Sequence, residues 1–279
     1  RGKKVAVVTN PPETQNLYKA ESVTNYPGII NMSGKNFALL LHEQLEKSEA
    51  QLIHGRALSV MDFGGSFGVA VGNDYHSTKA VILALGITRE KLYPGEGEFL
   101  GRGVSYCATC DGMFFRDKTV AVVGGGNSAV AEVLFLSRIA KKVYLIHRRD
   151  TLRATKVYHE PLMKAEGIEF LWNSEVTELI YDKRLSGVKI RNKQSGEESE
   201  LSLDGLFISI RRSPETAVLG GLVALDASGY IVAGEDTRTS VEGVFAAGDV
   251  RTKALRQIVT AAADGAVAAH FAEEYIATL

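Results

Sequence analysis

An apolar segment followed directly by three glycines constrains the fold of this chain more than any other feature. Residues 119–123 read Thr-Val-Ala-Val-Val, a β-branched run with the length of a buried strand. Residues 124–129 read Gly-Gly-Gly-Asn-Ser-Ala, which matches the G-x-G-x-x-A fingerprint of dinucleotide-binding turns. Apolar residues at helical spacing follow, and residues 142–146 supply a second apolar strand. This order predicts a βαβ unit within an α/β fold.

The small residues of the fingerprint have separate physical roles. Gly124 would make the tight turn, Gly126 would let a pyrophosphate approach the backbone, and Ala129 would seat the helix on the strand. A glycine-rich turn without a ligand is the alternative, but the strand–turn–helix–strand context favours a bound dinucleotide. We expect the cofactor contacts to come from Gly124, Gly126, Asn127, Ser128 and Ala129.

The residues after the second strand select the dinucleotide. NAD sites usually carry an acid here for the ribose 2′-hydroxyl, whereas this chain continues with His147-Arg148-Arg149 and has Arg153 one turn later. Guanidinium groups suit a 2′-phosphate because they bind phosphate through paired hydrogen bonds. A solvated basic turn is the alternative, and Asp150 does not replace the missing acid. The pattern favours NADPH over NADH, with His147, Arg148, Arg149 and Arg153 as binding residues.

The only two cysteines of the chain lie close together, as Cys107-Ala-Thr-Cys110, with Asp111 next. A gap of this length brings both sulfurs within disulfide reach. A purely stabilising cross-link is one interpretation, but closing so short a loop removes little entropy from the unfolded chain. Zinc would need two more ligands, and no second cysteine pair or spaced histidine pair supplies them. The pattern therefore favours a redox-active pair, and we expect no metal site.

A third signal lies near the C-terminus. Residues 243–249 form a short apolar strand that ends at Gly248 and Asp249, and a helix rich in small residues starts near Gln257. A carboxylate at the end of a strand would accept hydrogen bonds from a ribityl chain, and a helix N-terminus offers positive potential to a flavin ring. A packed alanine-rich helix with a capping Asp is the alternative. The expected contacts are Gly248, Asp249, Arg256, Gln257 and Ile258.

Composition and charge exclude several classes of function. The 279 residues carry a formal net charge of −1, with 45% hydrophobic and 23% charged residues, as in an ordinary soluble globular protein. The mixed charges argue against nucleic-acid and membrane-surface binding, and no apolar run reaches the roughly 20 residues that span a bilayer. The length predicts about two domains. A lone, closely spaced cysteine pair fits a reducing compartment, so we expect a cytoplasmic protein.

Taken in order, these motifs resemble the low-molecular-weight thioredoxin reductases. The most specific string is Cys-Ala-Thr-Cys-Asp-Gly at 107–112, and the likeness extends over nearly the whole chain, from Asn25-Tyr-Pro-Gly to Arg256-Gln257. It implies a homodimeric flavoenzyme with two Rossmann-like dinucleotide-binding domains, in which an inserted NADPH domain splits the FAD domain. The implied ranges are 1–88 and 211–279 for FAD and 89–210 for NADPH. Asn25 would be a further cofactor contact.

The resemblance also implies a mechanism. NADPH would reduce FAD, and FAD would reduce the Cys107–Cys110 disulfide, with Cys110 facing the flavin. Cys107 would then attack the disulfide of thioredoxin or a similar small protein, with Asp111 as general acid–base. One domain would rotate against the other about crossings near 86–89 and 210–212, where Gly86 suits a hinge.

Departures from the family pattern leave alternatives open. The strand and glycine turn that open the family are missing, so we expect a further segment before residue 1. Residues 3–8 would then be the second strand, followed by Thr9-Asn10 where the family has an acid. Residues 14–16 replace a glycine pair, and Arg211-Arg212 replace Gly-His. The alternatives are a related flavin disulfide reductase with ferredoxin as donor or another disulfide target, and a binding or scaffold protein that has lost flavin.

Overall fold

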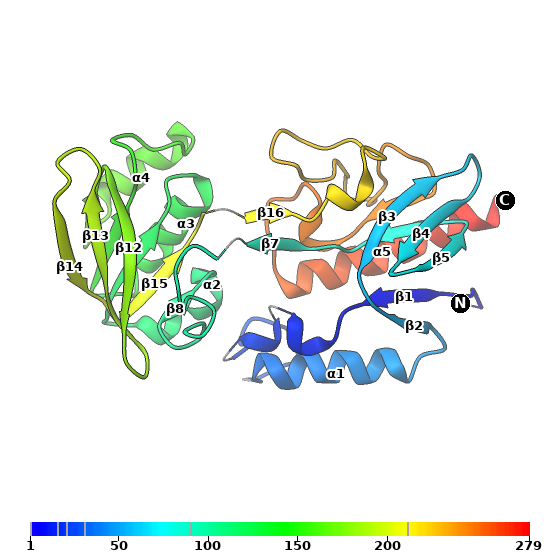
Figure 1. The fold of residues 1–279 in the computed structure, drawn as a ribbon, viewed down its shortest axis with the longest axis horizontal. Helices are drawn as coiled ribbons and strands as arrows, with labels where there is room; N and C mark the ends of the chain where they lie inside the picture. The colour runs from blue at the N-terminus through cyan, green and yellow to red at the C-terminus, as the bar shows by residue number, and fades with distance from the viewer. Residues whose placement is uncertain (1, 16, 21, 31, 90, 211) are drawn as a thin grey trace. The chain divides into compact units, whose positions relative to one another are not determined.

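The chain forms two compact units, which are described separately (Figure 1). The computed structural model describes residues 2–15, 17–20, 22–30, 32–89, 91–210 and 212–279. The first unit comprises Arg1–Tyr18, Tyr26–Arg89 and Arg212–Leu279, and the second comprises Lys19–Asn25 and Glu90–Arg211. Asn16 and Arg211, which belong to two of the sequence departures, lie outside the described residues.

A five-stranded parallel sheet organises the second unit. Its strand order is β11-β10-β9-β15-β8, and every neighbouring pair is parallel. The strands are β8 (Val104–Ser105), β9 (Thr119–Val123), β10 (Lys142–Ile146), β11 (Ile168–Leu171) and β15 (Gly205–Ile208). The helices are α2 (Ala108–Asp111), η3 (Gly112–Phe115), α3 (Asn127–Leu136), η4 (Lys156–Tyr158) and α4 (His159–Lys164). The predicted βαβ unit is β9–α3–β10.

Burial on both faces explains the unbroken apolar sequence of β9. Successive side chains of a strand point to opposite faces. Val120 and Val122 pack with Val133 of α3 in one cluster. Ala121 and Val123 pack in another cluster with the antiparallel sheet of β12 (Ser174–Tyr181), β13 (Leu185–Asn192) and β14 (Glu198–Ser202). The central strand is therefore enclosed and positions the glycine turn rigidly.

The first unit is built from small sheets and two long helices. Strand β1 (Ala6–Thr9) pairs in parallel with β2 (Gln51–His54), and β6 (Val81–Leu83) pairs in parallel with β17 (Val244–Ala246). An antiparallel sheet contains β3 (Ala57–Asp62), β4 (Phe67–Val71) and β5 (Asp74–Thr78). The long helices are α1 (Gly34–Glu46) and α5 (Ile258–Ala277), and the short ones are η1 (Pro12–Thr14), η2 (Leu17–Lys19), η5 (Ala217–Leu219) and η6 (Gly248–Val250).

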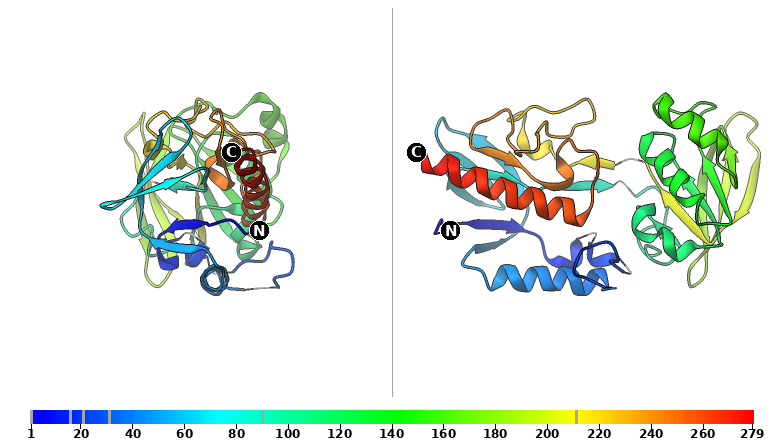
Figure 2. Two further views of the ribbon diagram at one scale, coloured as in Figure 1. Left: turned by 90° about the vertical axis from the view of Figure 1, so that its right-hand side faces the viewer. Right: turned by 180° about the vertical axis from the view of Figure 1, so that it is seen from behind.

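Helix α5 packs along β17 through small residues. Phe245 of β17 shares a buried cluster with Ala268 and Ala272 of α5, because alanine side chains let the helix approach the strand closely. Figure 2 shows α5 in red alongside the strands of the first unit, which also carries both chain ends. The expected small-residue helix thus packs against β17, the strand that precedes Asp249.

The two segments at the boundaries between the units pair with each other. Strand β7 (Ile87–Arg89) is antiparallel to β16 (Arg212–Pro214), with Thr88 opposite Ser213 and Ile87 opposite Pro214. Gly86, directly before β7, has φ +68°, a conformation that glycine adopts without strain. Segments more than 120 residues apart in sequence therefore form one short ribbon, since the hydrogen bond from Thr88 to the Ser213 carbonyl spans 125 residues.

Candidate active site

Cys107 and Cys110 form a disulfide at the start of α2, directly after the edge strand β8. Their Cα atoms are 5.3 Å apart, within the range that a disulfide spans. The Cys107 carbonyl accepts hydrogen bonds from the N–H groups of Cys110 (3.2 Å) and Asp111 (3.0 Å), so a single helical turn presents all three residues together. The structure thus joins the two cysteines that the sequence paired.

Ser105 links the disulfide turn to its acid, a contact that the sequence analysis missed. The Ser105 hydroxyl donates to Asp111 Oδ2 at 2.6 Å and accepts the Cys107 N–H at 3.1 Å. Ser105 and Asp111 line a cavity of about 220 Å³ together with Phe114, Lys118 and Arg184, among other residues. The acid therefore has access to solvent while one of its oxygens is fixed.

A buried glutamate holds the residue before Cys107. Glu96 is only 1% exposed, yet its carboxylate accepts hydrogen bonds from the Tyr106 hydroxyl (2.6 Å) and from the N–H groups of Leu92 (2.8 Å) and Tyr93 (3.1 Å). Three donors satisfy a carboxylate that is removed from water. No spacing signal connects Glu96 with the cysteines, so sequence reasoning could not find it.

The glycine turn after β9 fits a dinucleotide phosphate. Gly124 has φ +153°, and a Cβ there would lie 2.7 Å from the Ala129 Cβ and 2.9 Å from the Ser209 carbonyl oxygen, so only glycine packs at this position. A Cβ on Gly126, in contrast, would meet nothing within 4 Å. That open space lies at the N-terminus of α3, where unpaired N–H groups and the helix dipole favour an anion.

The basic cluster, which consists of His147, Arg148, Arg149 and Arg153, is connected to the glycine turn by backbone hydrogen bonds at Arg153. The Gly125 carbonyl accepts the N–H groups of Arg153 (2.7 Å) and Ala154 (3.0 Å), and Asn127 Oδ1 accepts the Thr155 N–H at 2.8 Å. Asn127 therefore closes the loop with its side chain. Arg153 is exposed and lies beside the turn, as a 2′-phosphate site after the second strand requires.

His147 differs from the arginines of the cluster. Arg148 and Arg149 are exposed, whereas His147 is 5% exposed, with Nε2 3.1 Å from the Thr151 carbonyl oxygen. Burial lowers the pKa of His147, and the neighbouring arginine charges lower it further, against the opposing hydrogen bond to Thr151. The imidazole is therefore mostly buried and contacts the Thr151 carbonyl, whereas the guanidinium groups of Arg148 and Arg149 are exposed, and cofactor binding by His147 stays a prediction.

The C-terminal strand β17 leads into a second glycine turn, at Gly248. Gly248 has φ +75°, and a Cβ there would lie 3.3 Å from the Ala261 Cβ of α5. Its N–H donates to Asp264 Oδ2 at 2.9 Å. This bond orients the short helix η6, on which Asp249 is half-buried. The close turn and the first turn of α5 suit the flavin half of FAD.

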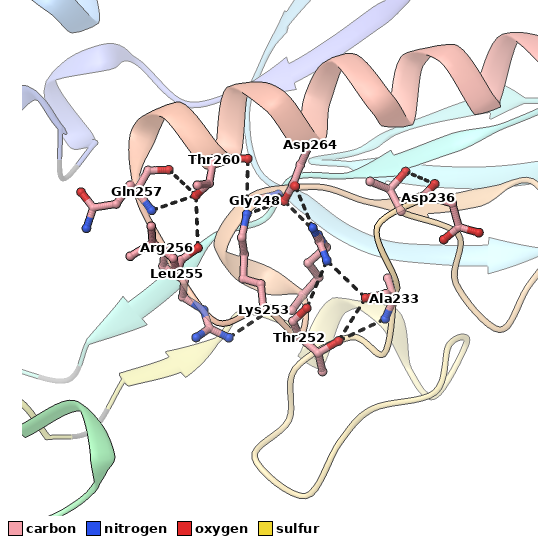
Figure 3. Close-up of polar contacts among 12 residues, drawn as sticks. Ala233, Asp236, Gly248, Thr252, Lys253, Leu255, Arg256, Gln257, Thr260 and Asp264 are labelled. Carbon is pink, nitrogen blue, oxygen red and sulfur yellow. Dashed lines mark hydrogen bonds and ion pairs between the residues drawn. The ribbon is translucent and has the colours of Figure 1, made fainter. Parts of the chain in front are cut away.

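Asp264 is the centre of a buried ion network (Figure 3). Arg251 donates to both carboxylate oxygens, at 2.9 and 2.8 Å, and Lys253 Nζ donates to Oδ2 at 2.7 Å. Burial alone would raise the pKa of Asp264, but the hydrogen bonds from Arg251, Lys253 and the Gly248 N–H outweigh it and lower the pKa to about 2. The sequence analysis missed this network, because charged residues in a helix and a loop carry no pairing signal.

Arg256 and Gln257 are engaged in the structure of the loop itself. The Arg256 guanidinium donates to the carbonyls of Asp249 and Arg251, both at 3.1 Å, and lies 4.1 Å from the centre of the Tyr230 ring. Gln257 caps α5 through reciprocal side-chain hydrogen bonds with Thr260. The first turn of α5 begins at Ile258, and its backbone N–H groups point towards the N-terminal end of the helix. A hydrogen-bond acceptor placed at that end would be stabilised by these groups and by the helix dipole.

Asn25, the remaining predicted cofactor contact, is exposed and belongs to the second unit, whereas Asp249 belongs to the first. The cofactor contact of Asn25 therefore stays a prediction. At the end of β1, Thr9 Oγ1 donates to the Asn10 carbonyl at 3.2 Å. The described residues contain no group of three or more His, Cys, Asp or Glu side chains arranged to hold a metal. Every helix in the described ranges is too short or too polar to cross a bilayer.

Three features together define a dinucleotide-dependent disulfide oxidoreductase. They are the parallel sheet, the glycine turn with the nearby arginines 148, 149 and 153, and the disulfide beside an acid. The chain belongs to the pyridine nucleotide-disulphide oxidoreductase family, whose sequence profile matches residues 2–265. This membership confirms the expected enzyme class, and the family uses FAD together with a pyridine nucleotide.

Within that family, the chain is similar to thioredoxin reductases. The thioredoxin reductase of Treponema pallidum is 44% identical over 261 residues, or 93% of this chain and 85% of that protein. The crystal structure of thioredoxin reductase from Streptococcus pyogenes matches with a TM-score of 0.91 at 38% identity, covering 99% of this chain and 90% of that one. The thioredoxin reductase from Giardia duodenalis also has a TM-score of 0.91, at 33% identity, covering 98% and 91%. The expected Rossmann-type two-domain flavoprotein fold is confirmed.

A ferredoxin-linked relative is more distant. A ferredoxin-flavin thioredoxin reductase from Clostridium acetobutylicum matches with a TM-score of 0.52 at 28% identity, covering 100% of this chain and 91% of that one. The thioredoxin reductases of Treponema pallidum and Streptococcus pyogenes are therefore more similar to this chain in sequence, and the latter also in structure.

Proposed function

We propose that the chain is an NADPH-dependent thioredoxin-disulfide reductase. The observation that carries this proposal is the Cys107–Cys110 disulfide on one helical turn with Asp111, in a chain that closely resembles thioredoxin reductases. Two electrons and two protons convert the disulfide into two thiols. We further propose a cytoplasmic homodimer, as the resemblance implies.

When bound, the pyridine nucleotide and FAD would together supply the electron pair that reduces the disulfide. Arg148, Arg149 and Arg153 would hold the 2′-phosphate, and the α3 N-terminus at Gly126 would hold the pyrophosphate. Gly248, Asp249 and the first turn of α5 would hold the flavin half of FAD. These assignments explain why both glycine turns lie at the ends of buried parallel strands.

The dithiol then reduces the partner by exchange. The Cys107 thiolate attacks one sulfur of the partner disulfide, which forms a mixed disulfide and expels a partner thiolate. Asp111 protonates that leaving thiolate, and the Cys110 thiolate attacks Cys107 in turn. The Cys107–Cys110 bond is restored, and the second partner thiol leaves. The two protons of the enzyme dithiol end on the partner thiols, so that an enzyme dithiol and a partner disulfide become an enzyme disulfide and a partner dithiol.

An anaerobic titration tests the proposal. The purified protein, supplied with FAD, is titrated with NADPH while the flavin absorbance is followed, and oxidised thioredoxin is then added. We expect NADPH to bleach the flavin and thioredoxin to restore its colour. Failure to bind flavin would support the scaffold alternative. Bleaching by reduced ferredoxin but not by NADPH would support the ferredoxin-linked alternative, against which the arginine cluster argues.

A further inference from the structure

We infer that Ser105 is a positioning residue for the acid of the disulfide turn, an inference that rests on the proposed function. Its hydroxyl bonds both to the acid and to the backbone of the first cysteine: it donates to Asp111 Oδ2 at 2.6 Å and accepts the Cys107 N–H at 3.1 Å. The Cys107 carbonyl lies farther from the same hydroxyl, at 3.4 Å. A hydroxyl has one proton, so the shorter contact to the carboxylate takes it.

The sheet holds Ser105 in place. Ser105 is 2% exposed and is the last residue of β8, where it lies opposite Phe207 of the fully buried strand β15. The next residue, Tyr106, is anchored by its hydroxyl bond to Glu96. Because the backbone of Ser105 is fixed on both sides, its hydroxyl stays in one place. The hydrogen bond therefore fixes the orientation of the Asp111 carboxylate.

This arrangement assigns different tasks to the two oxygens of Asp111. A carboxyl oxygen that accepts a short hydrogen bond from a hydroxyl is the less favourable position for the proton of the acid, because the unprotonated oxygen is the stronger acceptor. The exchangeable proton of Asp111 therefore belongs on Oδ1, and Ser105 stabilises the ionised form after the proton has left. Asp111 then returns to the same orientation in every cycle, which keeps its proton within reach of the departing thiolate.

Two cations also line the cavity beside the carboxylate. Lys118, before β9, and Arg184, before β13, are the charged residues among those that line the cavity with Asp111. Both are cations on other segments and favour the ionised carboxylate through space, without fixing which oxygen bears the proton. The Ser105 hydroxyl, in contrast, donates a hydrogen bond directly to Oδ2 of that carboxylate.

The test uses Ser105→Ala, with Ser174→Ala as the matched control. Ser174 is a buried serine of the same unit, 7% exposed, whose hydroxyl donates to the Trp172 carbonyl at 2.8 Å. With oxidised thioredoxin as substrate, we expect Ser105→Ala to slow disulfide exchange about tenfold, whereas flavin reduction by NADPH is unchanged. In a plot of exchange rate against pH, the midpoint on the acidic side should rise by about one pH unit in Ser105→Ala. The reason is that the ionised carboxylate loses a charge-assisted hydrogen bond.

A double-mutant cycle separates positioning from a structural role. In an Asp111→Asn background, Ser105→Ala should slow exchange by less than twofold if the serine acts through the carboxylate. An equal slowing in both backgrounds, or an effect no larger than that of Ser174→Ala, would overturn the inference. If Ser105→Ala fails to fold, Ser105→Thr retains the hydroxyl: a wild-type pH profile supports the inference, and a shifted profile in a folded variant overturns it.

A measurement without partner or cofactor distinguishes this inference from the proposed function. Protein reduced with dithiothreitol is alkylated with iodoacetamide over a range of pH, and the rate at Cys107 is determined. The Asp111 titration should appear in the wild-type profile and move up by about one unit in Ser105→Ala. That shift would stand even if thioredoxin proved not to be the substrate. Superimposed wild-type and variant profiles would overturn the role of Ser105 alone.

Discussion

The carboxylate of Asp264, in the second turn of α5, accepts a hydrogen bond at 2.9 Å from the backbone N–H of Gly248, sixteen residues earlier. The same carboxylate forms ion pairs with Arg251 and Lys253, whose side chains are also buried. One acid therefore joins the glycine turn, the following loop and the C-terminal helix. The loop that we assign to flavin binding is thus held by an ion network as well as by apolar packing of Val250.

Asp264→Ala should destabilise the protein by about 3 kcal/mol, because it leaves two buried cations without their acid. The free energy of unfolding in urea measures the loss. Glu178→Ala is the control, since Glu178 forms an exposed pair with Lys189 at 2.8 Å and should cost less than about 1 kcal/mol. Equal losses for the two variants would show that the network at Asp264 is not stabilising.

The same carboxylate predicts how stability depends on pH. The pKa of Asp264 is lowered from 3.8 to about 2 in the folded protein, so its contribution is fully present above about pH 4 and is lost as the pH falls towards 2. The shift corresponds to about 2 kcal/mol. Unfolding free energies of the wild type and Asp264→Asn between pH 2 and 5 test this. The variant curve should be flatter by that amount, and parallel curves would contradict the assignment.

Cys107→Ser should abolish thioredoxin reduction, because no thiolate remains to attack the partner. Reduction of flavin by NADPH should continue, since that step does not use the disulfide. Stopped-flow absorbance measures the flavin step, and turnover with thioredoxin measures the complete reaction. Flavin that NADPH no longer reduces, in a folded variant that still binds FAD, would show that Cys107 has another role.

Replacing Arg148 and Arg149 together with alanine should weaken NADPH binding about thirtyfold while changing NADH binding less than threefold. Only NADPH carries the 2′-phosphate that guanidinium groups would bind through charge-assisted hydrogen bonds. Arg191→Ala is the control, because Arg191 is an exposed arginine of the same unit that pairs with Glu175 at 2.7 Å. Steady-state KM values for both nucleotides measure the effect. Equal losses with NADPH and NADH would exclude the phosphate site.

Two glycine variants separate packing from cofactor approach. Gly124→Ala should destabilise the protein by about 2 kcal/mol, because its Cβ would collide with Ala129 and with the Ser209 carbonyl. Gly126→Ala, with φ −95° and open space around the new Cβ, should change stability by less than about 0.5 kcal/mol but weaken NADPH binding. Thermal unfolding and nucleotide titration measure both. Unimpaired NADPH binding by Gly126→Ala would place the pyrophosphate elsewhere.

Local patterns were sufficient to predict much of the second unit. The β9–α3–β10 unit follows from an apolar run, a glycine turn and a helical repeat that are contiguous in sequence. The cysteine pair could also be predicted, since its spacing alone brings the sulfurs within reach. In the first unit, strand β17, the glycine turn at Gly248 and the start of α5 were predicted for the same reason. In each case the interacting residues are neighbours along the chain.

Contacts between distant segments were decided only by the tertiary structure. The burial of His147, the loop closure by Asn127 and Thr155, and the pairing of β7 with β16 all depend on segments that meet only after folding. Ser105 and Asp264 carry no recognisable motif, because a single polar residue does not specify its partner. The sequence by itself determined the turns, the disulfide and the class of cofactor. Tertiary packing then decided which polar side chains hydrogen-bond to these turns. A buried hydrogen bond forms only where folding brings its donor and acceptor into contact.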